Sequence, residues 1–252
     1  MSYIDLSNIN NALIVGAGHG IGLAFCEEIL KLNPQIAMHA TYRREEKANK
    51  LFDLKKSFSN LSIYQVNPVN EAEVINLKTK SKIQKINLLI NCIGTLQDDT
   101  VSPERSLREI DISKLQHYFL INSSITPLLA KHFKDCFRGK HSSCFAAISA
   151  KVGSIDDNSL GGWYGYRASK AALNMFIINI SIEFKRSAPN SVVLAIHPGT
   201  TITELSEDFI QNTNLKLHKP NQTAENILNI IKNKDPKQTG QFVSWDQSNI
   251  TW

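Results

Sequence analysis

The chain has 252 residues, of which 42% are hydrophobic and 20% are charged, an ordinary balance for a globular protein with a sizeable core. The formal net charge is +5, and the lysines are scattered rather than massed in one block, so neither nucleic acid nor a membrane surface is indicated as a partner. No run of about 18 apolar residues is present, so no membrane span is expected.

The four cysteines form no CxxC pair and have no zinc-like spacing to histidine. Cys26, Cys92 and Cys144 lie in apolar runs, which is typical of buried, reduced thiols. Residues 1–11 are polar and lack the basic and apolar regions of a signal peptide. We therefore expect a reducing, cytoplasmic setting.

Strand and helix patterns alternate in the first part of the chain. A strand is predicted three times, each time followed by a helix: 12–15 then 21–32, 35–42 then 45–58, and 61–66 then 71–83. The first of these helices ends before Asn33-Pro34, because the residue ahead of a proline disfavours the α conformation.

The second part of the chain continues the alternation with longer connections. In chain order we predict a strand at 86–93, a polar stretch at 95–103, a long helix at 113–137, a strand at 142–149, a loop at 151–165, a helix at 164–185, a strand at 191–196, a mobile connection at 200–218, a helix at 223–231 and a strand at 241–245.

Strands that are apolar on both faces and alternate with helices indicate a parallel sheet covered on two sides. Right-handed crossovers then give a doubly wound, Rossmann-type α/β fold with about seven strands flanked by helices. No composition shift, linker or internal repeat divides the chain, so residues 1–252 are predicted to form one domain.

The first predicted strand runs directly into a glycine-rich turn, GAGHGIG, at residues 16–22. The spacing Gly16-x-x-x-Gly20-x-Gly22 does not satisfy G-x-G-x-x-G, although Gly18 lies between them. Because the turn follows a strand and opens a helix, its amide groups could face a pyrophosphate. The alternative is a tight strand–helix turn without a ligand.

The tip of the second strand carries Arg43 and Arg44, with no acidic residue before Glu45. An acidic residue there would favour a ribose hydroxyl, whereas a guanidinium suits a 2′-phosphate. His19, inside the glycine turn, could add a second contact. This pattern favours NADP(H) over NAD(H), unless both arginines only open a solvated helix.

Tyr166 and Lys170 stand four residues apart in YRASK, so they share one face of a predicted helix. A phenol near a fixed positive charge has a lowered pKa and can act as an acid or a base. A phosphate site combined with such a phenol suggests hydride transfer between a nicotinamide and a carbonyl.

Two asparagines could have either a functional or a purely structural role. Asn91 ends a strand in NCIG, where it could close a cofactor cleft or simply form a turn. Asn122 lies inside a predicted helix, where asparagine is a poor helix former, ahead of Pro127. It indicates a local kink or a bound water, or else a tolerated surface residue.

The motifs GAGHGIG, NCIG, Asn122, YRASK and HPGTT follow one another in an order and spacing that resembles the short-chain dehydrogenases/reductases. The stretch VGSIDDNSLGGWYGYRASKAALN and the C-terminal GQFVSWDQSNITW are similar to the C-factor and sniffer carbonyl-reductase branch. Although YxxxK alone is weak, the ordered set is a strong signal.

This resemblance implies a role for each matching residue. Tyr166 would protonate the carbonyl oxygen, Lys170 would lower the pKa of that phenol and hold the nicotinamide ribose, and Asn122 would anchor a water. The cofactor would lie along a larger set that the resemblance implies: Gly16, Gly18, His19, Gly20, Ile21, Gly22, Arg43, Asn67, Asn91, Gly94, Tyr166, Lys170, Pro198, Gly199 and Thr203. The segment after Thr203 would fold over the site as a lid.

Two positions depart from the family pattern. The family serine usually precedes a glycine by three positions, and counting back from Gly153 gives Ala150. The adjacent Ser149 could replace it only if the strand end twists or bulges, because neighbours on a strand face opposite ways. The second departure is Asn67, where the family has an aspartate near adenine, although an amide keeps one acceptor oxygen.

The predicted function is an NADP(H)-dependent carbonyl reductase that acts on a small aldehyde or ketone, or on the corresponding alcohol. Four apolar residues are expected to line an apolar substrate pocket: Leu96, Leu160, Trp163 and Leu205. The alternative for each is that it only packs its loop against the core. The alternative is a catalytically weakened cofactor-binding or signalling protein on the same fold, which Ala150 favours. The resemblance also implies a homodimer or homotetramer.

Overall fold

The computed structural model describes residues 3–210 and 215–252, except for the side chains of residues 209 and 210. Its centre is one sheet of seven parallel strands in the order β3-β2-β1-β4-β5-β6-β9. The strands are β1 (Asn11–Val15), β2 (Ala37–Tyr42), β3 (Leu61–Gln65), β4 (Leu88–Asn91), β5 (Ser143–Ile148), β6 (Ser191–His197) and β9 (Gln241–Ser244). The predicted doubly wound α/β fold is confirmed.

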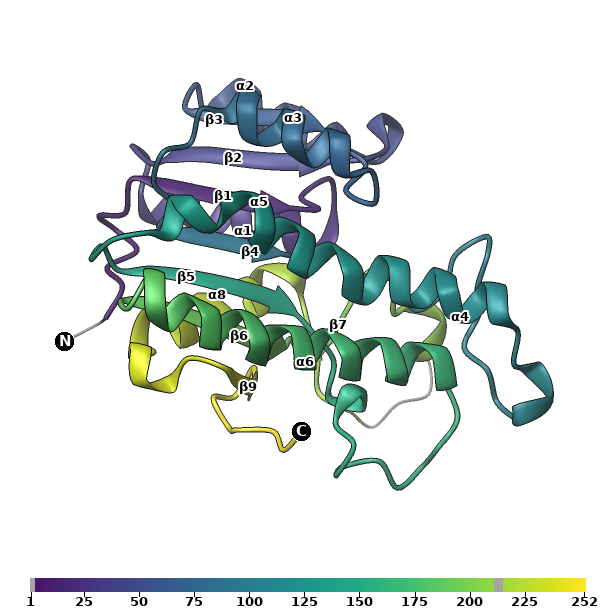
Figure 1. Ribbon diagram of the computed structural model, residues 1–252. Helices are drawn as coiled ribbons and strands as arrows, with labels where there is room; N and C mark the ends of the chain where they lie inside the picture. The colour runs from purple at the N-terminus through teal and green to yellow at the C-terminus, as the bar shows by residue number, and fades with distance from the viewer. Residues whose placement is uncertain (1–2, 211–214) are drawn as a thin grey trace.

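Helices cover both faces of the sheet, as Figure 1 shows. The longer ones are α1 (Gly20–Leu32), α2 (Asn49–Ser57), α3 (Glu71–Ser81), α4 (Ile112–Phe119), α5 (Ile125–Phe137), α6 (Tyr164–Ser187) and α8 (Pro220–Asn233). Apolar residues of α1, α2 and α8 pack into one core, and those of α3, α5 and α6 pack into a second core on the opposite face.

The alternation of side chains along each strand explains why the strands are apolar throughout. In β1, Ala12 and Ile14 belong to the core beneath α1 and α8, whereas Leu13 and Val15 belong to the core beneath α5 and α6. Successive side chains point to opposite faces of a sheet, so a strand buried on both faces needs an unbroken apolar run.

Three predicted elements were wrong in detail. The helix predicted at 45–58 is a 3-10 turn, η1 (Glu45–Lys47), followed after Ala48 by α2. The helix predicted at 113–137 is α4 and α5 joined by a π-helical turn, η3 (Leu120–Ser124). The connection predicted at 200–218 contains β7 (Thr200–Thr201), α7 (Glu207–Ile210) and β8 (Leu217–His218), while its residues 211–214 lie outside the described residues.

All seven strands point the same way, so their carboxyl ends share one edge of the sheet. The glycine turn follows β1 there, and the segments after β4, β5 and β6 leave the sheet at the same edge. In Figure 1 the arrowhead of β5 points toward the end of the molecule where α4 lies. This edge gathers every motif singled out in the sequence. Within 3–210 and 215–252, no helix combines the length and apolar character needed to cross a bilayer.

Candidate active site

Lys170, Asn122 and Gly94 converge at the carboxyl edge of the sheet. A methyl group placed on Gly94 would lie 3.1 Å from Lys170 Nζ and 3.3 Å from Asn122 Oδ1, so the missing side chain keeps this space open. Lys170 Nζ donates a hydrogen bond to the Ile148 carbonyl at 3.0 Å, at the end of β5. The structure therefore brings together three residues that lie on three separate elements.

Asn122 owes its position to the π-helical turn η3. This wider turn carries its side chain inward, where it is buried and makes three hydrogen bonds. Asn122 Oδ1 accepts from the Thr95 amide at 2.7 Å, and Nδ2 donates to the Thr95 carbonyl at 2.9 Å and to Ser169 Oγ at 3.0 Å. The asparagine thus ties the loop after β4 to α6. Single π-turns are rare and occur often at functional sites.

Tyr166 is buried, with 8% of its surface exposed, in a small apolar cluster separate from the two main cores. Its ring meets those of Tyr118 and Trp163 edge-on, with centroids 6.3 Å and 6.2 Å away. Lys170 Nζ lies 5.8 Å from the Tyr166 ring centroid. The lysine therefore sits over the ring face.

Burial is the main influence on the pKa values of Tyr166 and Lys170. Burial raises the pKa of the Tyr166 phenol above its ordinary value. Burial also lowers the pKa of Lys170 to about 8, since its ammonium loses hydration. Desolvation of both groups outweighs their mutual attraction, so Tyr166 is a protonated phenol at neutral pH.

The structure does not bring Ser149 to Tyr166. The Ser149 hydroxyl is buried and donates to Asn174 Oδ1 at 2.7 Å, while Ala150 packs against the cluster that contains Tyr166. The strand end does not bulge, because β5 keeps regular parallel register with β6 as far as Ile148. Ala150 therefore stands beside the Tyr166 cluster, whereas the Ser149 hydroxyl is engaged with Asn174.

The apolar wall around Tyr166 differs in part from the predicted one. Leu96 and Trp163 belong to the cluster, whereas Leu160 is 89% exposed and Leu205 is 36% exposed. Val101, Tyr118 and Val152 join the cluster without having been singled out in the sequence. They lie on three separate segments, so no local spacing could have shown that they meet.

The glycine turn is built for close backbone approach. Gly22 packs so tightly that a methyl group on it would lie 2.1 Å from the Gly16 carbonyl oxygen. Gly20 faces Thr203, whose Cγ2 would lie 3.5 Å from a methyl group on Gly20. The first amides of the turn are held by Thr41, since the Gly16 amide donates to Thr41 Oγ1 at 3.0 Å and the Ala17 amide to the Thr41 carbonyl at 2.7 Å. The turn then opens α1 at Gly20, where the helix N-terminus can face an anion, with the segment after β6 alongside it.

Asn67 carries a buried acceptor that no described residue satisfies. Its side-chain Oδ1 has no hydrogen-bond partner within residues 3–210 and 215–252. Its backbone N–H donates to Glu73 Oε2 at 2.6 Å. Asn67 follows β3 at the same edge of the sheet as the glycine turn. Buried polar atoms are normally paired, so this oxygen is suited to receive a donor from a bound molecule.

Several cationic groups surround the tip of β2. Arg43 and Arg44 are exposed there, and Lys47 forms an ion pair with Glu204 of the segment after β6. Lys47, Glu204 and His19 also line a hollow of about 400 Å³ beside the glycine turn. The hollow has mixed charge, because Lys47 and Lys50 face the carboxylates of Glu27, Glu46 and Glu204, whereas Arg43 and Arg44 are not among its lining residues.

The remaining predicted residues occupy the same edge with structural contacts. Asn91 Nδ2 donates to Thr126 Oγ1 at 2.9 Å and its Oδ1 accepts from the Ile93 amide at 3.1 Å, so it shapes the turn after β4. Ile21 is half-buried at the start of α1 and packs on the core beneath it. Pro198 and Gly199 follow β6 directly.

The segment after β6 lies across this edge and contacts both of its sides. Glu204 reaches Lys47 beyond β2, and Gln97, in the loop after β4, donates a hydrogen bond to Asp208. Thr203 lies beside Gly20. The segment thus spans the space between the glycine turn and the Tyr166 cluster.

Comparison with known proteins shows the family of this chain and agrees with its fold. Residues 10–214 match the family model of the short chain dehydrogenases. A 1-hydroxy-2-glutathionyl-2-methyl-3-butene dehydrogenase from Rhodococcus sp. is 28% identical over 183 residues, which is 71% of this chain and 74% of that protein. The C-signal protein of Myxococcus xanthus is 24% identical over 58% of this chain and 84% of its own length.

Solved structures of carbonyl reductases share the fold closely. The Sniffer carbonyl reductase of D. melanogaster superposes with a TM-score of 0.86 at 24% identity, covering 97% of this chain and 100% of that one. An NADPH-bound carbonyl reductase from chicken fatty liver superposes with a TM-score of 0.85 at 22% identity, covering 98% and 96%. The resemblance to the C-factor and sniffer branch is therefore confirmed.

Proposed function

Because this chain belongs to the short-chain dehydrogenase family, we propose that it is an NADP(H)-dependent carbonyl reductase that uses Tyr166 as its proton donor. The observation that carries the proposal is the meeting of Lys170 and Asn122 at Gly94, beside the buried phenol of Tyr166. A protein that only bound a nucleotide would have no need of this set.

NADP(H) is the cofactor that the residues fit best. The helix N-terminus after the glycine turn suits a pyrophosphate, the unpaired Asn67 oxygen suits the amino group of adenine, and Arg43 with His19 suits a 2′-phosphate. Pro198, Gly199 and Thr203 would line the nicotinamide end. The NADPH-bound state of the chicken carbonyl reductase supports the same choice.

The chain's own residues would manage the proton. When bound, the nicotinamide supplies or accepts the hydride. In the reducing direction the Tyr166 phenol would give its proton to the carbonyl oxygen, and this proton together with a hydride on the carbonyl carbon makes the alcohol. The raised pKa of Tyr166 keeps this acid protonated beforehand, and the Lys170 ammonium stabilises the phenolate left behind. Asn122 would hold a water that returns the proton.

The substrate we propose is a small apolar aldehyde or ketone, because the cluster around Tyr166 is lined by Leu96, Val101 and Trp163. A panel of apolar aldehydes, quinones and polar sugars, followed by the loss of NADPH absorbance, tests this choice. Turnover confined to the sugars would contradict it.

A second candidate function is a cofactor-binding or signalling protein whose catalysis has weakened. Ala150 favours it, since an oxyanion has one hydrogen-bond donor fewer than in the usual pattern, and the C-signal relative is consistent with it. Removing one such donor lowers rate by about 10²–10³-fold.

Replacing Ala150 by serine distinguishes the two functions. We expect Ala150→Ser to raise the turnover number of a weak reductase by about tenfold or more, because a hydroxyl would face the Tyr166 cluster. The turnover number is measured by steady-state NADPH oxidation. Ser149→Ala is the matched control, and we expect its turnover number to change only as far as the variant is less stably folded. Absence of turnover in both the wild type and Ala150→Ser would favour the binding protein.

The pH dependence of carbonyl reduction should follow Lys170. Its lowered pKa of about 8 means that the ammonium loses its proton earlier than an ordinary lysine, while Tyr166 stays protonated. We therefore expect kcat/KM to be level below that pH and to fall above it. In Lys170→Arg, whose guanidinium stays charged, the fall should move to higher pH even if the rate is lower. An identical profile in both proteins would exclude Lys170 as the titrating group.

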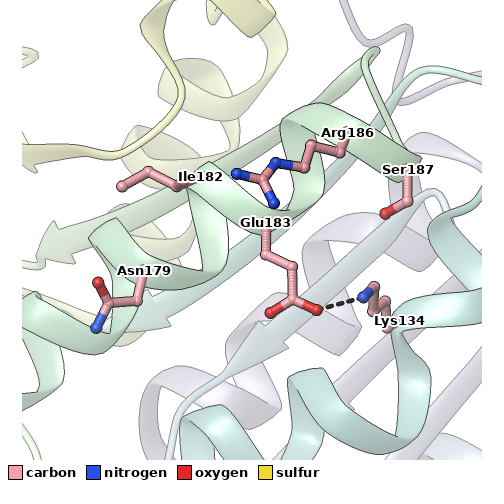
Figure 2. A pocket seen from close by; sticks show the side chains of 6 residues that line it. All are labelled: Lys134, Asn179, Ile182, Glu183, Arg186 and Ser187. Atoms are coloured by element: carbon pink, nitrogen blue, oxygen red, sulfur yellow. Dashed lines mark hydrogen bonds and ion pairs between the residues drawn. The ribbon is translucent and has the colours of Figure 1, made fainter.

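We also propose that the protein assembles as a homodimer or homotetramer through α5 and α6. Met175 and Ile182 of α6 are 57% and 49% exposed, which is high for such large apolar side chains. Ile182 also lines a hollow of about 390 Å³. Figure 2 shows Glu183 of α6 turned toward Lys134 of α5, with which it forms an ion pair. Sedimentation equilibrium would contradict this assembly by finding only monomer at micromolar concentration.

A further inference from the structure

Glu104 is a buried carboxylate that the proposed chemistry does not use. Only 1% of its surface is exposed, although it lies in the loop between β4 and α4. Its Oε1 atom has no hydrogen-bond partner among the described residues. Burying a carboxylate is costly unless something compensates its charge, so its surroundings must explain its place.

Both hydrogen bonds of Glu104 go to the start of α6. Its side-chain Oε2 accepts from the Gly165 amide at 3.1 Å, and its backbone carbonyl accepts from the Trp163 amide at 2.6 Å. The first amides of a helix have no partner within the helix and carry partial positive charge. The partial positive charge at the start of α6 therefore compensates the charge of the carboxylate. In return, the carboxylate accepts the hydrogen bond of the Gly165 amide, which has no partner within the helix.

The sequence supplies no local cap at this helix end. The residue before α6 is Trp163, in a left-handed conformation with φ of 51°, and an indole has no acceptor for a helix amide. The usual side-chain cap bonds the second or third amide of the helix. Glu104 makes the bond to the second amide from 61 residues away.

Gly165 makes room for this contact. A methyl group on Gly165 would lie 2.4 Å from Tyr118 Cδ2 and 2.9 Å from Glu104 Oε1. Tyr118 is itself held by its hydroxyl, which donates to the Leu96 carbonyl at 2.6 Å. The first turn of α6 is thus contacted by Tyr118 and by Glu104 at Gly165, the residue directly before Tyr166.

We propose that Glu104 is a positioning residue for Tyr166. It caps the first turn of α6 from a distant loop and so fixes the backbone from which the phenol projects into its apolar cluster. The loop that carries Glu104 also carries Val101, which packs in the Tyr166 cluster, so the same loop sets the substrate wall and the acid together. This inference rests on the proposed role of Tyr166.

The test compares Glu104→Ala and Glu104→Gln with Asp235→Ala. Asp235 caps the 3-10 turn η5 (Pro236–Gln238), ahead of β9, by accepting from the Lys237 amide at 2.7 Å, so its loss removes a carboxylate cap at an exposed site away from Tyr166. Two sets of measurements are made on each variant. The first is kcat, KM and NADPH affinity, and the second is hydrogen exchange of the amides of residues 163–170.

We expect Glu104→Ala to lower kcat by about 10–100-fold, because a misplaced acid loses rate steeply, while NADPH affinity stays unchanged. Its amides at 163–170 should exchange faster than in the wild type. Glu104→Gln keeps an acceptor oxygen for the Gly165 amide, so its kcat and its amide exchange at 163–170 should lie close to those of the wild type. Asp235→Ala should alter neither quantity.

Two results would overturn the inference: a fall in kcat no larger than that of Asp235→Ala, or unchanged exchange at 163–170 in Glu104→Ala. If the wild type showed no turnover, the proposed function would fail instead. The exchange measurement would then still decide whether Glu104 holds the first turn of α6.

Discussion

Replacing Tyr166 by phenylalanine should lower kcat by about 10²–10⁴-fold, the range contributed by a positioned general acid, while NADPH binds as in the wild type. The change removes one hydroxyl and keeps the ring that packs against Tyr118 and Trp163. The loss should therefore appear in turnover and not in folding. Initial rates with a reactive aldehyde, together with NADPH titration by fluorescence, measure both quantities.

Tyr64→Phe is the matched control for this variant. Tyr64 lies on β3, and its hydroxyl is 3.1 Å from His39 Nδ1, so the same atom is removed from a half-buried tyrosine at another place on the sheet. We expect it to turn over like the wild type. If Tyr166→Phe did so as well, the phenol would not be the proton donor.

Replacing Gly22 by alanine should destabilise the protein by about 3 kcal/mol or more and abolish measurable cofactor binding, since overpacking against backbone exceeds the usual cost of an added methyl group. The new methyl group would lie 2.1 Å from the Gly16 carbonyl oxygen, and neither backbone atom can move without opening the turn. Denaturant unfolding gives the change in the free energy of unfolding, and NADPH titration gives the loss of binding.

Gly18→Ala provides the comparison within the same turn. A methyl group there would come no closer than 3.4 Å, to Tyr42 Cβ, which is an ordinary contact. We expect a change in the free energy of unfolding within about 1 kcal/mol, as for most substitutions that create no clash. Equal destabilisation by the two variants would mean that the turn tolerates no side chain anywhere and that the Gly22 contact is not special.

The fold was predictable because each strand is buried on both faces and each helix has one apolar face. The strand at 12–15 is a clear example, since all four of its residues are fully buried in two different cores. The break in the helix predicted at 113–137 was not predictable, because a π-turn needs one extra residue in a turn and Asn122 gave only a weak hint of it.

The site was predictable where chemistry follows from spacing, and not where it depends on tertiary contacts. Tyr166 and Lys170 share a helix face, so their spacing already indicated a pair. The orientation of Ser149 toward Asn174 and the burial of the phenol depend on how α6 packs against β5. Glu104 is 61 residues from the amide that it caps, and no local pattern links the two.

The most direct test of the central proposal is titration of the purified protein with NADPH and with NADH, followed by addition of apolar aldehydes and quinones to the same samples. We predict tighter binding of NADPH than of NADH, and oxidation of the bound NADPH when a suitable carbonyl is added. Binding of NADPH without oxidation by any carbonyl would contradict the reductase and leave the cofactor-binding protein as the better description.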